Sequence, residues 1–149
     1  MEYATIEREL MIDAPPDVVY QVISTPQHLA QWWPDRADLE AVPGAAGSVS
    51  FGDPDAPAKV VPITVVDADP SRRFAFRWVY EDDDAAALLV TFELTPSDGG
   101  TLLRFTETGF REKGWEIAVM EEQYRDHARG WDHFLPRLVD YAARLAPAQ

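Results

Sequence analysis

Hydrophobic and polar residues alternate along the first part of the chain. From Thr5 to Ile12 the residues follow a period of two, which predicts a half-buried β-strand. One face carries Ile6, Leu10 and Ile12, and the other carries Glu7, Glu9 and Met11. Arg8 falls on the apolar face, so its side chain is expected to point inward.

Two short helices are predicted after this strand. The stretch DAPPDVVYQVIST, residues 13–25, has prolines suited to a first helical turn, Asp13 as a cap and a one-sided apolar stripe. Pro26 ends this helix, because the residue before proline avoids the α region. A second helix over about 27–32 is stopped by Pro34. Trp32 and Trp33 therefore lie at a helix C-terminus, where we expect one indole to pack inward and the other to cover or line an entrance.

The period of two returns between residues 48 and 110. Strands are predicted over 48–51, 59–66, 73–80, 87–95 and 101–110. Pro62 indicates an edge strand or a bulge. The turn PSDGG at 96–100 predicts a hairpin, because Asp-Gly accepts positive φ at little cost. Consecutive short strands joined by turns predict an antiparallel sheet.

The C-terminal segment changes to a helical period. Apolar residues recur three or four apart over 115–145, which predicts one long helix. We expect Gly130 to let the backbone approach a neighbour, and Pro136 to cause a kink or break near 130–133. There is no internal repeat and no linker, so residues 1–149 are expected to form a single α+β domain with a core over about 5–145. Its curved antiparallel sheet, of about six or seven strands, wraps around the long helix.

A sheet that curls in this way leaves a hollow that one helix does not fill, so a ligand cavity is predicted between sheet and helix. Inward positions of both layers give the candidate ligand-binding residues. They are Trp33, Phe76, Trp78, Phe92, Phe105, Glu107, Tyr124, His127 and Trp131. For Tyr124, Trp78 and Trp131, core packing is the main interpretation, with cavity lining as a side effect.

Glu107 and His127 are the candidate polar groups of this interior. A buried Glu107 needs a partner, or else it serves as an acid or base. The structural alternatives are a pair with Arg8 or a tyrosine, or exposure at the strand end. His127 orients a ligand or is a satisfied interface histidine. No catalytic residue is assigned.

Composition excludes several classes of protein and site. The net charge of −13 disfavours nucleic acid and anionic membranes as partners. With no cysteine there are no disulfides or thiolate sites. His28, His127 and His133 are too scattered for a metal site, and no cofactor motif is present, so neither metal nor cofactor is expected. The N-terminal residues lack a signal-peptide pattern and no apolar run reaches about 20 residues, which predicts a cytoplasmic protein.

The order of these elements resembles the START-like superfamily, also called SRPBCC, polyketide-cyclase-like or helix-grip. DAPPDVVYQVISTPQHLAQWW followed by HARGWDHFLPRLVDYAARL is similar to the family named after the C-terminal domain of the activator of heat shock protein 90 ATPase. The resemblance covers about Thr5 to Leu145. It implies the helix-grip fold, which hosts binders, lyases, cyclases and transport proteins, and it leaves the activity open.

Three functions are consistent with these features. The first is binding of a small apolar or aromatic molecule between sheet and helix, without catalysis. The second uses the same cavity for acid–base chemistry, such as cyclisation or hydration of a polyketide-like substrate. The third is an interaction module that docks a chaperone or a second copy of the chain, with an exposed indole of the tryptophan pair as its anchor.

Overall fold

The sheet and its helices account for most of the chain. A computed structural model describes residues 5–33, 36–51, 59–78, 88–109 and 117–145, without the side chains of residues 51, 59, 117–121 and 123. The strands are β1 (Thr5–Ile12), β2 (Arg36–Asp38), β3 (Ala46–Phe51), β4 (Lys59–Asp69), β5 (Arg73–Trp78), β6 (Leu88–Ser97) and β7 (Gly100–Thr108). The helices are α1 (Pro16–Ser24), α2 (Pro26–Trp32) and α3 (Ile117–Leu145). None of these helices is long and apolar enough to cross a bilayer.

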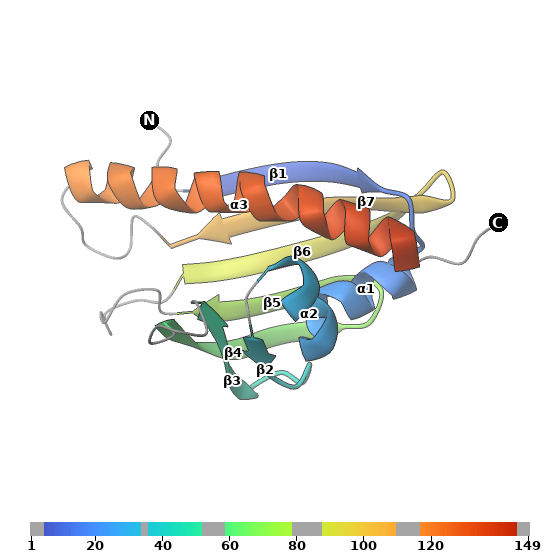
Figure 1. The fold of residues 1–149 in the computed structure, drawn as a ribbon, viewed down its shortest axis with the longest axis horizontal. Coiled ribbons are helices and arrows are strands. Elements are labelled where there is room, and N and C mark those ends of the chain that lie inside the picture. The colour runs from blue at the N-terminus through green and yellow to red at the C-terminus, as the bar shows by residue number, and fades with distance from the viewer. Residues whose placement is uncertain (1–4, 34–35, 52–58, 79–87, 110–116, 146–149) are drawn as a thin grey trace.

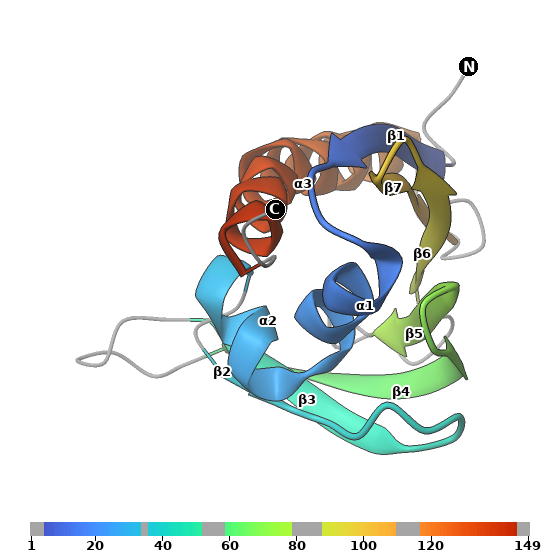
Figure 2. The same ribbon diagram turned by 90° about the vertical axis from the view of Figure 1, so that its right-hand side faces the viewer.

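These strands form one antiparallel sheet, in the order β1-β7-β6-β5-β4-β3-β2. The sheet curves into an open ring, and α3 lies along its open side next to β1 (Figure 2). The two short helices α1 and α2 occupy the inside of the curve at one end, while α3 runs the length of β1 and β7 (Figure 1). This arrangement confirms the predicted α+β helix-grip fold, with two short helices after the first strand.

The hairpin between β6 and β7 sets the register that matters for the site. Asp98 and Gly99 both have positive φ, 48° and 84°, and Ser97 pairs with Gly100. A two-residue turn of this kind matches the twist of the strands it joins. The predicted hairpin is therefore confirmed, and its register places Val90 opposite Glu107.

Two expectations about the remaining strands are wrong. The strand β2 is absent from the sequence prediction, because three residues carry too little alternation to be recognised. Pro62 does not mark an edge, since β4 lies between β3 and β5. The bulge in β4 falls between Val65 and Asp67, and Pro62 is on the exposed face, where Val60 is also exposed.

The start of α1 differs from the predicted cap. The N-cap residue is Pro15, in an extended conformation, and no side chain caps the helix. Asp13 lies two residues upstream of the N-cap, whereas the capping side chain belongs to the N-cap residue itself. Capping by Asp13 is therefore wrong, while the proline-started helix and its buried stripe are confirmed.

The long helix α3 runs from Ile117 to Leu145 without the expected break at 130–133, and Pro136 lies inside it. Proline removes one intrahelical hydrogen bond, but Leu135, Leu138 and Ala142 are buried around it and hold the helix on the sheet. Gly130 makes no close backbone approach either, because a Cβ added there meets nothing within 4 Å.

Replacing Gly130 with alanine is expected to stabilise the protein. Alanine has the better helix propensity and space is open for its methyl group, so Gly130→Ala should raise the free energy of unfolding by about 0.5–1 kcal/mol. Urea unfolding followed by circular dichroism measures this. The matched control is Gly47→Ala, which should destabilise, because its Cβ would lie 2.3 Å from the Asp38 carbonyl oxygen. A destabilised Gly130→Ala protein would contradict the open-space description.

The buried phenol of Tyr20 predicts a stability loss at alkaline pH. Burial raises the pKa of Tyr20, and the nearby Asp69 and Asp67 charges add to the effect. The folded-state pKa therefore exceeds the unfolded value. The stabilising contribution is complete below about pH 10 and is lost as pH rises through the folded pKa. Unfolding measured between pH 9 and 11 should show a steeper loss for the wild type than for Tyr20→Phe, and equal slopes would refute this.

Candidate functional site

Glu107 lies on the inward face of β7 and is fully buried. Alternation along β7 brings Thr101, Leu103, Phe105 and Glu107 to this face, as the sequence predicted. Its neighbours across the sheet are Val90 on β6 and Ile6 on β1, both apolar and buried. A carboxylate in such surroundings requires hydrogen-bond donors from another element.

Three N–H groups supply those donors. The Nε1 atom of Trp78 on β5 donates to Oε2 at 2.8 Å, and Nε1 of Trp131 on α3 donates to Oε1 at 2.9 Å. Nδ1 of His127, also on α3, lies 2.9 Å from Oε1. An ionised carboxylate accepts hydrogen bonds only, so it matches a set made entirely of donors. The carboxylate thereby joins β5, β7 and α3.

The contact with Glu107 sets the orientation of His127. The ring is buried at 6% exposure, and it meets the Trp78 ring edge-on at 5.7 Å. Since a carboxylate cannot donate, the hydrogen of this bond belongs to Nδ1. In the neutral ring the basic nitrogen is then Nε2, which is also buried.

Aromatic rings surround the carboxylate network. Trp33 is the central ring of this group, with ring-centroid distances of 5.1 Å to Trp131, 5.3 Å to Trp78 and 5.7 Å to Phe76. The rings of Phe105 and Trp131 are 4.5 Å apart. These contacts fall within the range in which aromatic pairs attract each other beyond simple burial. They form one continuous aromatic surface between sheet and helix.

Both members of the tryptophan pair are buried, so neither is the exposed indole that the docking hypothesis requires. Trp32 is 0% exposed and Trp33 is 6% exposed, and the two rings stack at 6.0 Å. Trp32 donates its Nε1 hydrogen to the carbonyl of Val22. Trp33 is the C-cap of α2, with φ −124° and ψ −89°, so its ring does not follow the helical period.

Eight of the nine predicted ligand-binding residues meet in one cluster. Phe92 joins it through Phe105, at 5.3 Å between ring centroids, and also contacts Trp32. Tyr124 is half-buried and packs at the margin of the core. The donor role of Trp78 and Trp131 was missed by the sequence prediction. The available signal was that a buried indole N–H needs an acceptor, and an inward glutamate provides one.

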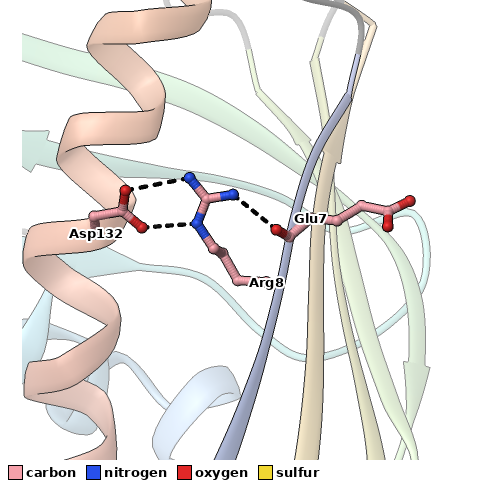
Figure 3. Close-up of polar contacts among 3 residues, drawn as sticks. All are labelled: Glu7, Arg8 and Asp132. Atoms are coloured by element: carbon pink, nitrogen blue, oxygen red, sulfur yellow. Dashed lines mark hydrogen bonds and ion pairs between the residues drawn. The ribbon is translucent and has the colours of Figure 1, made fainter. Parts of the chain in front are cut away.

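Arg8 does not pair with Glu107, so that predicted alternative is wrong. Its Nε and Nη2 atoms donate to Oδ1 and Oδ2 of Asp132 on α3, at 2.7 and 3.2 Å. Nη1 donates to the Glu7 carbonyl at 2.8 Å (Figure 3). The hydrogen bond with Asp132 raises the pKa of Arg8 further above its usual value. With 33% of its side chain exposed, the guanidinium avoids the desolvation that a pair with buried Glu107 would require.

The carboxylate network lies at one end of the interior. Trp78 is the last residue of β5, Glu107 is close to the end of β7, and His127 is buried in the N-terminal half of α3. The other end is filled by α1, where Thr101 at the start of β7 donates to the Ala14 carbonyl. An interior site therefore has its polar groups at the end away from α1.

Two hollows bounded by described residues lie elsewhere. One of about 370 Å³ is bounded by Glu7, Arg8, Glu9 and Arg104. Another of about 630 Å³ lies where α1 meets the β4–β5 turn and the last residues of β6. None of the nine candidate residues lines either hollow. Beyond Trp78 and Gly109 the chain continues into residues outside the described ranges, among them the predicted strand ends at Tyr80 and Phe110.

Metal ligands do not gather in the described part of the chain. It contains no group of three histidine, aspartate or glutamate side chains placed to hold a metal ion. His28 contacts the Tyr141 hydroxyl at 2.7 Å, and His133 is exposed.

Removing the Glu107 carboxylate is expected to destabilise the protein strongly. Glu107→Leu removes the carboxylate acceptor from three buried donors, at about 1–3 kcal/mol each, so a loss of about 3 kcal/mol or more is expected in urea unfolding. Glu107→Gln, which keeps one acceptor oxygen, should lose less. The control Glu9→Leu, on the exposed face of β1, should stay within about 0.5 kcal/mol of the wild type. A Glu107→Leu protein as stable as this control would show that the network does not hold the fold.

Solved structures share this fold at low sequence identity. Protein MLL2253 from Mesorhizobium loti is 22% identical with a TM-score of 0.78, over 96% of this chain and 99% of its own. The Aha1 dimer from Colwellia psychrerythraea is 19% identical with a TM-score of 0.74, over 97% and 98%. CalU16 from Micromonospora echinospora is 21% identical with a TM-score of 0.70, over 93% and 76%.

Sequence comparison agrees with the fold. No curated protein sequence matches the chain at a significant level. The profile described as Activator of Hsp90 ATPase homolog 1-like protein matches residues 13–143. That span includes α1, α3 as far as residue 143 and every residue of the carboxylate network. The chain therefore belongs to the Activator of Hsp90 ATPase homolog 1-like family.

Proposed function

We propose that this protein binds a small aromatic or apolar molecule in the interior between sheet and α3, at the end where Trp78, Glu107 and His127 meet. The observation that carries the proposal is the fully buried Glu107 carboxylate within an aromatic surface. Small-molecule sites are mostly apolar with a few placed polar groups, and this is their composition. The chain is proposed to act in the cytoplasm.

The energetics of the network support a role beyond packing. Burying a charge has a large desolvation cost, and well-packed apolar residues of similar volume would hold a helix on a sheet equally well. A carboxylate with an oriented imidazole beside it places hydrogen-bonding groups at one end of the interior, which apolar residues do not provide. A ligand that reaches this end of the interior meets flat aromatic faces and one fixed polar point.

The position of the network supports the same proposal. Next to α1, the side chains of Leu29 and Trp32 on α2 and of Leu138 on α3 are all buried. A ligand is therefore expected at the other end, against Trp78, His127 and Trp131. The superfamily that the sequence resembles includes both binders and cyclases, which is consistent with a guest in this interior.

Catalysis in the same site is the second candidate, and one contact favours it. Glu107 holds His127 by Nδ1, as an orienting carboxylate holds a general base. Proton transfer by His127 would suit the cyclisation or hydration of a polyketide-like substrate. The third hypothesis, docking of a chaperone or a second copy, loses its anchor, because Trp33 is buried at 6% exposure.

Ligand binding is tested by a thermal-shift screen of neutral aromatic compounds. A ligand present at 100 times its dissociation constant adds about 2.7 kcal/mol, which corresponds to about 5–10 °C in a domain of this size. His127→Leu should weaken the hits that carry a polar group more than purely apolar ones. The control Val60→Ser, on the exposed face of β4, should bind as the wild type does. A folded protein that no compound in a broad screen stabilises would overturn the proposal, and consumption of a hit would identify an enzyme.

A further inference from the structure

We infer that Glu107 determines the charge class of the ligand, so that the site selects uncharged aromatic molecules bearing an O–H or N–H donor and rejects aromatic carboxylates. This inference rests on the proposed function, because it concerns the same site. It follows from the acceptor positions of Glu107 that the network occupies, and from the donors that are already bonded to it.

One acceptor position on Glu107 is left by the network. A carboxylate has about four lone-pair positions. Oε1 accepts from His127 and Trp131, while Oε2 accepts from Trp78 alone among the described residues. The remaining position on Oε2 is complementary to a ligand donor. Hydrogen bonds to a charged acceptor are the strong ones, and they are worth more where water is excluded.

The donors of the site are already committed. The two indole N–H groups and the Nδ1–H of His127 all point at Glu107, so they do not serve a ligand carboxylate. Among the described residues, the buried ionisable side chains around the core are Tyr20, Glu107 and His127, and no lysine or arginine joins them. Arg8 is the cation on the neighbouring strand, and its guanidinium is bound to Asp132 and to the Glu7 carbonyl.

A carboxylate ligand would therefore meet a buried like charge, and the described part of the chain offers it no buried cation. Two like charges about 4 Å apart repel by several kcal/mol at the effective dielectric constant of protein sites. The net charge of the chain, −13, acts in the same direction at longer range. The two contributions are separable, because salt screens the long-range field and leaves a buried pair largely unscreened.

Three probes of nearly equal shape test the inference: 2-naphthalenemethanol, 2-methylnaphthalene and 2-naphthoate. Their dissociation constants are measured by tryptophan fluorescence at pH 8 and about 150 mM salt, where an ordinary imidazole is neutral. The alcohol should bind about tenfold or more tightly than methylnaphthalene, through the bond to Oε2. Naphthoate should bind at least about 100-fold more weakly than the alcohol, and 0.5 M salt should not remove the difference.

The variant Glu107→Gln removes the charge and keeps the shape. It should reduce the difference between alcohol and naphthoate to below about tenfold, while Glu9→Gln on the exposed face of β1 should keep the wild-type ratio. Naphthoate binding as tightly as the alcohol would overturn the inference and leave the proposed function intact. If the site binds none of the three probes, the proposed function fails, and this inference with it. The wild-type series decides the question even if Glu107→Gln does not fold.

Discussion

The hydrogen bonds to the Glu107 carboxylate are the contact on which the relation of sheet to helix depends. A helix laid on a sheet shares no backbone hydrogen bonds with it, so its position rests on side chains alone. Here Trp131 and His127 of α3 and Trp78 of β5 donate to one carboxylate of β7. The Arg8–Asp132 pair supports the same helix from β1 and is half-exposed, so it contributes less. The buried network therefore sets where α3 lies, and with it the shape of the interior.

The same contacts fix the chemistry of that interior. Each polar group that faces the aromatic surface is oriented by another: His127 by Glu107, and Glu107 by two indoles. Trp33 connects α2 to the same group of side chains, because its ring contacts Phe76, Trp78 and Trp131 together. A ligand here would meet side chains already held in place, which lowers the entropy cost of binding. Stability and the proposed recognition thus depend on one set of residues.

Much of this arrangement could be predicted from alternation and turn chemistry, which identified most of the strands, the hairpin at Asp98–Gly99 and the inward position of Glu107. Alternation predicts the face of the sheet to which a side chain points, but it does not predict which residue that side chain contacts. Arg8 and Glu107 share the inner side of neighbouring strands, yet Arg8 reaches Asp132, because its long side chain extends to the exposed flank of α3. The orientation of Trp33 was equally beyond a periodic pattern, since helical periodicity ends at the C-cap. At Gly130 and Pro136 the local rules were outweighed by packing of α3 on the sheet.

Membership of the family does not determine the polar groups of this site, and the reason is physical. The fold requires apolar residues at inward positions, and many combinations meet that requirement. The charge, donors and acceptors at the end of the interior depend on a few positions, chiefly 78, 107, 127 and 131. A relative with the same sheet and helix but an apolar residue at position 107 would keep the architecture and lose the acceptor that we propose for a ligand. Which molecules a member of this family accepts must therefore be derived from these side chains, because the shared backbone is compatible with opposite preferences.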